Sequence, residues 1–231
     1  MTCGAESARV CRWRESQEEI ARCGDCCGGE SGDAVSTPLQ VGEIPEPPNR
    51  IRILFIGVAP TPLRGRGKGT HFYSLRTDPL RLGLFSVLDS LFATKLINLN
   101  SAGKGEAEAA FHNAGFFFVH AAKVRPKITP APPAEVIAFC ARRHLIQEIC
   151  ILAPKALCFL GSKNTAHAIR AIFGRAIDDD PQLAPLDDGQ GATWEGSVAV
   201  AHQPRRGWNA RGGAATSSVI GRLKARLTEQ P

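Results

Sequence analysis

Residues 51–74 read IRILFIGVAPTPLRGRGKGTHFYS, and this stretch decides the fold that the sequence predicts. The apolar run Ile51–Ile56, rich in β-branched and aromatic residues and closed by Gly57, is typical of a buried strand. A loop rich in glycine, proline and basic residues follows it. Open α/β sheets bind their ligands where such strands end. The loop therefore predicts a site for a phosphate-bearing ligand, and the aromatic pair Phe72-Tyr73 predicts a surface on which a ring stacks.

The composition is that of a soluble globular chain with a basic balance. Of the 231 residues, 43% are hydrophobic and 22% are charged, and the formal net charge is +6. A basic balance favours encounters with a polyanion. Many basic residues fall in or beside three predicted loops, where they form either one basic face for nucleic acid or a solvated surface. They are Arg64, Arg66, Lys68, Arg76, Lys123, Arg125, Lys127, Arg205, Arg206 and Arg211.

No apolar run approaches the roughly 20 residues that span a bilayer, and the N-terminal stretch lacks the apolar core of a secretory signal. We therefore expect a cytoplasmic protein with no membrane contact. Residues 1–47 hold five of the eight cysteines and are predicted to form a Cys-rich N-terminal arm, followed by one domain over residues 48–231. In a cytoplasmic chain such cysteines are more typical of thiols or metal ligands than of disulfides.

From residue 51 onward, strand patterns alternate with helix patterns. The strands are predicted over residues 51–56, 115–122, 156–160 and 197–201, and the helices over residues 80–91, 134–149, 165–173 and 217–227. Residues 13–21 predict a short helix, Ser162 a helix cap and residues 178–191 an acidic surface loop. The alternation predicts a three-layer α/β/α fold with a short, mostly parallel central sheet. Three of the four strands end in polar and basic loops, which we expect to converge at the carboxyl edge of the sheet.

Two chemistries fit such a site. The segment Gly65–Thr70 imitates the end of a phosphate-binding P-loop, but Pro62 stands where that motif needs its first glycine, so a nucleotide-phosphate enzyme is a weak alternative. An enzyme that extrudes a nucleobase and cleaves its glycosidic bond needs a basic rim, a stacking ring, groups that read the base edge and a donor for charge on the leaving base. The aromatic pair supplies the ring, His120 lies near the end of one predicted strand, and His202 follows another directly.

A series of motifs supports the second chemistry. The chain carries, in order, the cysteine pair of Arg22–Cys26, the segment Phe55–Pro60, the aromatic residues of His71–Tyr73, the segment Val119–Pro126, Cys140, the segment Pro154–Gly161 and the segment His202–Pro204. In this order they resemble the uracil-DNA glycosylase superfamily, nearest to the bacterial and archaeal branch that carries an iron–sulfur cluster. The resemblance runs from about Trp13 to the C-terminus. It implies a uracil-DNA glycosylase-like fold and a monomer that acts on DNA.

The resemblance and the basic loops together imply roles for particular residues. His202 is expected to stabilise the leaving base, and backbone groups or His71 are expected to position the attacking water. The expected base-binding residues are Gly57, Ala59, Phe72 and His120, the expected contacts to DNA phosphates are Lys68, Arg205 and Arg206, and the expected cluster ligands are Cys23, Cys26 and Cys140.

Four positions depart from the pattern of the superfamily. Val58 replaces the acidic residue that positions water in related enzymes, and Gln203 interrupts the His-Pro pair of the second motif. His120 replaces an asparagine that reads the pyrimidine edge. A neutral imidazole offers one donor and one acceptor at a different geometry, so a base other than uracil is an open alternative. Val124 replaces one of four cluster cysteines.

A [4Fe–4S] cluster is held by four thiolates, so Cys23, Cys26 and Cys140 leave one place open. Three interpretations remain at this point. A cysteine of the arm (Cys3, Cys11 or Cys27) fills the place, the cluster is lost and the cysteines are plain thiols, or the site binds zinc.

The sequence thus predicts a monofunctional DNA glycosylase that flips a deaminated or otherwise altered base out of DNA and hydrolyses its N-glycosidic bond. The alternative is a member of the same superfamily that binds nucleic acid without catalysis. Only the enzyme leaves abasic sites in DNA, so this product separates the two.

Overall fold

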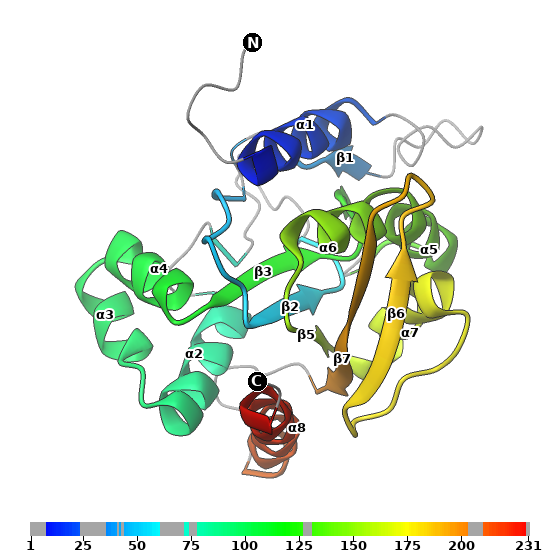
Figure 1. The fold of residues 1–231 in the computed structure, drawn as a ribbon. Helices are drawn as coiled ribbons and strands as arrows, with labels where there is room; N and C mark the ends of the chain where they lie inside the picture. Colours follow the sequence, from blue (N-terminus) through cyan, green and yellow to red (C-terminus); the bar gives the residue numbers. More distant parts are fainter. Residues whose placement is uncertain are drawn as a thin grey trace.

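The computed structural model describes residues 8–23, 36–40, 42, 44–60, 72–73, 78–126, 131–202 and 210–229. Its centre is a five-stranded sheet in the order β3-β2-β5-β7-β6 (Figure 1). The strands are β2 (Ile53–Gly57), β3 (Phe116–His120), β5 (Ala156–Leu160), β6 (Gln182–Asp187) and β7 (Thr193–Ala201). β3, β2, β5 and β7 run parallel, and β6 pairs antiparallel with β7. The predicted mostly parallel sheet is therefore confirmed.

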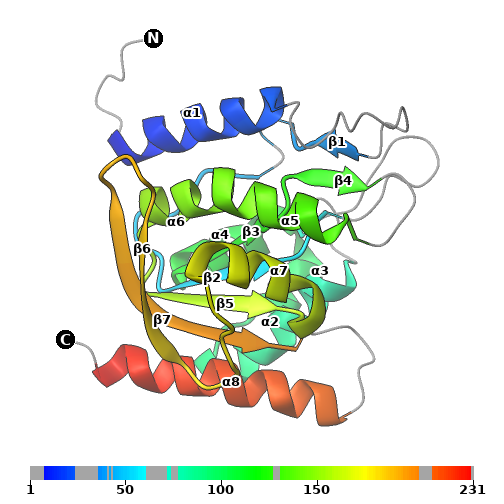
Figure 2. The ribbon, with the colours of Figure 1, turned by 90° about the vertical axis from the view of Figure 1, so that its right-hand side faces the viewer.

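Helices cover both faces of this sheet, which gives the three layers that the sequence predicts (Figure 2). One face carries α5 (Ala134–Cys140), a π-helical turn (Ala141–Leu145), α6 (Ile146–Leu152) and α7 (Ser162–Phe173), and the other carries α2 (Pro79–Phe92) and α8 (Ala210–Glu229). α3 (Leu96–Ala102) and α4 (Lys104–Asn113) follow α2, and α4 contacts β3. Because both faces are covered, β2, β3 and β5 are buried along their whole length, which explains their continuous apolar runs.

The described part of the segment before residue 48 packs on the rest of the chain. α1 (Ala8–Arg22) contacts α6, and the ring of Trp13 meets Phe117 edge-on at 5.6 Å. β1 (Ser36–Pro38) pairs antiparallel with β4 (Val124–Pro126) in a separate two-stranded sheet. α1 and β1 are therefore built against the sheet domain, and the domain division at residue 47 stays a prediction.

The sequence patterns missed some elements, and the structure corrects them. Residues 178–191, predicted as a surface loop, contain β6, in which Ala184 and Leu186 are buried and their neighbours are not. That alternation marks a strand with one covered face, although its acidic and proline residues suggested a loop. α7 begins at Ser162, so its N-cap is Gly161 and not the predicted serine. Among the described residues, no helix has both the length and the apolar character needed to cross a membrane.

Candidate functional site

The carboxyl ends of the parallel strands bring three predicted site residues to one edge of the sheet. Gly57 on β2 lies directly beside His120 on β3. Ala201, the last residue of β7, pairs with Leu160 of β5, and His202 comes next in the chain. β3 and β7 are separated by three strand spacings, or roughly 14 Å. The structure therefore places Gly57 and His120 side by side and puts His202 at the same edge, across β5.

One ring links the residues predicted to bind a base. A Cβ atom added to Gly57 would lie 2.7 Å from Cζ of Phe118 and 3.3 Å from Nδ1 of His120. The rings of Phe118 and His120 meet edge-on at 5.0 Å. Only a glycine allows this approach, because any side chain would overlap the Phe118 ring. Phe118 was not singled out from the sequence, where it is one of three consecutive phenylalanines in a buried strand.

Phe72 lies in the core and does not offer a free stacking surface. Its ring is stacked on Phe118, with centroids 4.4 Å apart and planes inclined by 11°. Phe85 and Phe111 contact the same ring, and only 1% of Phe72 is exposed. The aromatic neighbours explain this burial, since each ring removes apolar surface from water. In this structure the place on Phe72 where a base was predicted to stack is taken by Phe118.

Tyr73 supports the same strand from outside the sheet. β3 is an edge strand, so its outward N–H groups need partners other than a strand. The hydroxyl oxygen of Tyr73 accepts a hydrogen bond of 2.9 Å from the backbone N–H of Phe118. Burial raises the pKa of Tyr73 well above its ordinary value, so the hydroxyl stays protonated. Phe72 and Tyr73 therefore hold β3 in place, a role that the stacking prediction did not include.

A buried arginine holds the backbone of Phe72. Arg81 of α2 donates to the Phe72 carbonyl at 3.2 Å, to Asn100 Oδ1 at 2.8 Å and to Glu108 Oε1 at 3.1 Å. Its guanidinium also lies 4.8 Å from the centre of the Phe85 ring. The side chain of Arg81 is fully buried and that of Glu108 is 20% exposed. Arg81 therefore connects α2 to α3 and α4, and holds these helices against Phe72 and Phe85.

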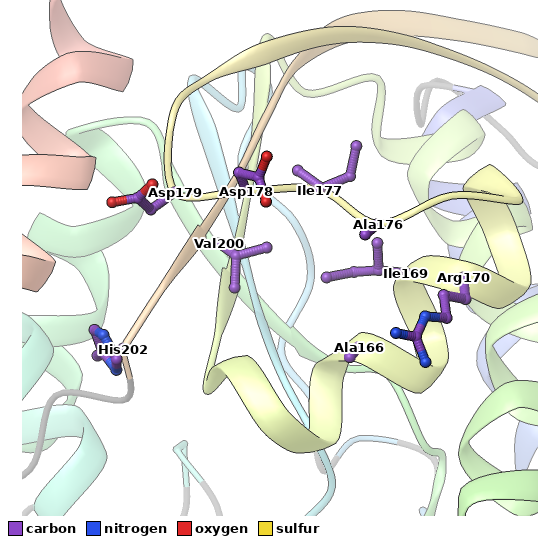
Figure 3. A pocket seen from close by; sticks show the side chains of 9 residues that line it. All are labelled: Ala166, Ile169, Arg170, Ala176, Ile177, Asp178, Asp179, Val200 and His202. Atoms are coloured by element: carbon purple, nitrogen blue, oxygen red, sulfur yellow. The ribbon is translucent and has the colours of Figure 1, made fainter.

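His202 is exposed and directly follows β7. Its carbonyl accepts a hydrogen bond of 3.0 Å from the hydroxyl of Thr216 on α8. His202 also lines a cavity of about 250 Å³, together with Ala166, Ile169, Arg170, Ala176, Ile177, Asp178, Asp179 and Val200 (Figure 3). Asp179 forms an ion pair of 3.3 Å with Arg222 of α8. Neither Gly57 nor His120 lines this cavity, so it lies beside the predicted base site.

The structure describes some of the remaining predicted site residues, and the others lie outside the described ranges. Ala59 is half-buried just beyond β2. His71, Lys68, Arg205, Arg206 and Cys26 lie outside the described residues. Two residues expected on the basic face do not belong there, because Lys123 is 1% and Arg125 is 6% exposed.

The cysteines do not present four thiolates in the described part of the chain. Cys23 is half-buried after α1, Cys140 is buried at the end of α5, and neither forms a disulfide. Cys11 is disulfide-bonded, so in this state it does not supply the missing ligand, and the expectation of plain thiols or metal ligands fails for it. Val124 is buried and apolar. Within the described ranges no group of three or more His, Cys, Asp or Glu side chains could hold a metal ion, and the iron–sulfur cluster stays a prediction.

His112 of α4 gives the aromatic region a pH-dependent stability. Burial, with a smaller contribution from the charge of Arg81, lowers its pKa from 6.5 to about 4. Between these values the unfolded chain binds the proton and the folded chain does not, so the free energy of unfolding decreases as pH falls from about 6.5 to about 4. We expect His112→Phe to reduce this decrease, as measured by urea unfolding at several pH values. The same slope in both proteins would contradict this account.

The fold is that of a three-layer α/β protein in which Gly57, His120 and Ala201 end parallel strands at one edge of the sheet. The family model of the uracil DNA glycosylase superfamily matches residues 45–210, which is most of the chain. The protein therefore belongs to the uracil DNA glycosylase superfamily, as the motif order predicts. A search of the curated proteins found no match.

Proposed function

We propose that this protein is a DNA N-glycosylase that releases a deaminated or otherwise altered base. The superfamily is one of mostly hydrolytic glycosylases that act on DNA, which supports DNA as the partner. The observation that supports the proposal best is the shared strand edge of Gly57, His120 and His202. A base between β3 and β7 would have a histidine on either side.

The two histidines can divide the chemistry. The imidazole of His120 offers a donor or an acceptor to the edge of the base. His202 donates a hydrogen bond to a base oxygen as negative charge develops there, which lowers the barrier to departure of the base. Water then adds to the sugar cation. Val58 is half-buried and apolar, so water positioning falls to backbone groups or to His71, and we expect slow turnover.

Stacking of a base on Phe72 requires a change at Phe118. In this structure its ring fills the space against Gly57 and Phe72. A base that stacks on Phe72 must therefore displace Phe118, whereas a base held only by the strand ends need not. The first arrangement restricts the size of the base, because Phe72 and Phe118 are buried.

A base-release assay tests the proposal. Oligonucleotides that contain uracil, hypoxanthine or xanthine, single- and double-stranded, are incubated with the protein, and abasic sites are cleaved with alkali. We expect release of at least one base, and a fall of about 10²–10³ in the rate for His202→Ala. His167→Ala, which changes a half-buried histidine of α7, should retain the rate. The absence of abasic sites with every oligonucleotide would refute the enzyme.

A non-catalytic nucleic-acid-binding protein is the second candidate. Val58 in place of the acid and the closed contact of Phe72 with Phe118 favour it over an efficient enzyme. This candidate predicts DNA binding that weakens with salt, since each phosphate contact releases counterions. If Lys68, Arg205 and Arg206 contact phosphates, replacement of each by alanine lowers the slope of log K against log salt by about 1. Salt-dependent DNA binding without release of any base would support the non-catalytic candidate over the enzyme.

The iron–sulfur cluster remains a separate proposal with Cys23, Cys26 and Cys140 as ligands. Such a cluster would link α1 to α5, because Cys23 follows α1 and Cys140 ends α5. Anaerobically purified protein should then be brown and contain iron and acid-labile sulfide. Colourless protein without iron would refute the cluster, and zinc in its place would identify the alternative metal.

A further inference from the structure

A buried ion pair between Lys123 and Glu148 contacts the backbone of His120. The ammonium group of Lys123 donates hydrogen bonds to the backbone carbonyl of His120 and to Oε2 of Glu148 on α6. The side chain of Lys123 is 2% exposed and that of Glu148 is not exposed at all. The amide of Gln17 on α1 donates to the other carboxylate oxygen of Glu148 at 3.0 Å. Four residues therefore link α1, α6 and the end of β3.

These hydrogen bonds meet the chain at His120, the last residue of β3. Two backbone hydrogen bonds hold the chain after His120. The N–H of Ala121 donates to the Gly57 carbonyl at 2.8 Å, and the N–H of Ala122 donates to the Val58 carbonyl. These bonds fix the side of the turn that faces β2. The ammonium of Lys123 holds the His120 carbonyl, which belongs to the same peptide group as the Ala121 N–H, so the two contacts together fix the peptide plane that follows His120. The direction of the imidazole depends on that plane.

Such a pair is not explained by stability alone. Removing two charges from water costs about as much as their attraction returns, and apolar residues of similar volume often stabilise a fold as well or better. A buried pair is instead suited to fixing one geometry, because the ammonium and the carboxylate accept few alternative arrangements. Here the ammonium of the pair binds the backbone carbonyl of His120, a residue at the sheet edge, where the geometry matters for binding.

We propose that Lys123 is a positioning residue for His120, and that Glu148 and Gln17 hold Lys123 in place. The proposal rests on the proposed function in so far as His120 reads the base. It makes α1, which lies before the 45–210 match to the superfamily, a part of the scaffold of the site. Orientation errors near 1 Å can cost about 10² in rate, so loss of this support should lower turnover without weakening DNA binding.

The test removes both charges at once. Lys123→Met/Glu148→Gln keeps the volume of both side chains and leaves Gln17 an amide partner, so we expect thermal unfolding within about 5 °C of wild type. The imidazole signals of His120, assigned by their loss in His120→Gln, should move in a histidine-selective NMR spectrum. With a releasable base, kcat should fall about tenfold to hundredfold at unchanged KM.

The matched control neutralises an exposed pair at the same helix junction. Arg143 and Glu19 also join α1 to the segment before α6, at 3.1 Å and with side chains 56% and 42% exposed. Arg143→Met/Glu19→Gln should leave the His120 signals and kcat as in wild type.

The outcomes separate this proposal from the proposed function. A folded Lys123→Met/Glu148→Gln protein with unmoved His120 signals would overturn the positioning role. If that variant does not fold, Gln17→Met tests the far end of the linkage, and unmoved His120 signals would again overturn the role. If wild type releases no base, the proposed function fails, while the NMR result still decides whether Lys123 positions His120.

Discussion

Gly57→Ala is expected to destabilise the protein by about 1–3 kcal/mol and to slow base release by about 10². The added methyl would lie 2.7 Å from the Phe118 ring and 3.3 Å from His120. Phe118 cannot move aside cheaply, because it is 1% exposed and stacked on Phe72. The methyl must therefore shift the ring, the imidazole or the strand end. Urea unfolding and the base-release assay measure the two effects.

The matched control adds the same methyl where space is open. A Cβ atom at Gly105 in α4 would meet nothing within 4 Å, and alanine is favoured over glycine inside a helix by roughly 0.5–1 kcal/mol. Gly105→Ala should therefore be neutral or stabilising and keep full activity. If Gly57→Ala behaved like this control, the close packing of the strand ends would have no functional meaning.

Arg81→Met is expected to lower the free energy of unfolding by about 3–5 kcal/mol, which corresponds to a fall of roughly 6–20 °C in the unfolding temperature. The substitution removes the three hydrogen bonds that Arg81 donates to Asn100 Oδ1, the Phe72 carbonyl and the Glu108 carboxylate. Thermal unfolding followed by circular dichroism measures the loss.

Arg52→Met is the control for this second substitution. Arg52 is half-buried and lies 5.4 Å from the ring of Phe92, an interaction worth about 1 kcal/mol. A loss for Arg81→Met no larger than that for Arg52→Met would show that the buried hydrogen bonds contribute little.

The regular elements followed from the sequence because their patterns are local. Ile53–Ile56 and residues 156–160 are apolar runs closed by glycine, and the structure has β2 and β5 there. The order of motifs also placed Gly57, His120 and His202 at strand ends. In contrast, β6 was missed, because its burial depends on pairing with β7 and not on its own composition.

The interior of the site could not be predicted, because it depends on contacts between distant segments. Nothing local distinguishes Phe118 from its two phenylalanine neighbours, or shows that Phe72 stacks on it. Lys123 was assigned to a basic surface from its place in a loop, whereas a carboxylate 25 residues away holds it in the interior. A glutamate on an apolar helix face, such as Glu148, was the one available signal for a buried cation.

The central claim is that a base binds where β2, β3 and β7 end, between His120 and His202. Histidine-selective NMR with an oligonucleotide that carries a cleavage-resistant 2′-fluoro nucleotide of uracil or hypoxanthine tests it most directly. The account predicts that the signals of His120 and His202 shift more than with an unmodified oligonucleotide, while those of His144 and His167 do not. Equal shifts with both oligonucleotides, or no shift at His120 and His202, would contradict it.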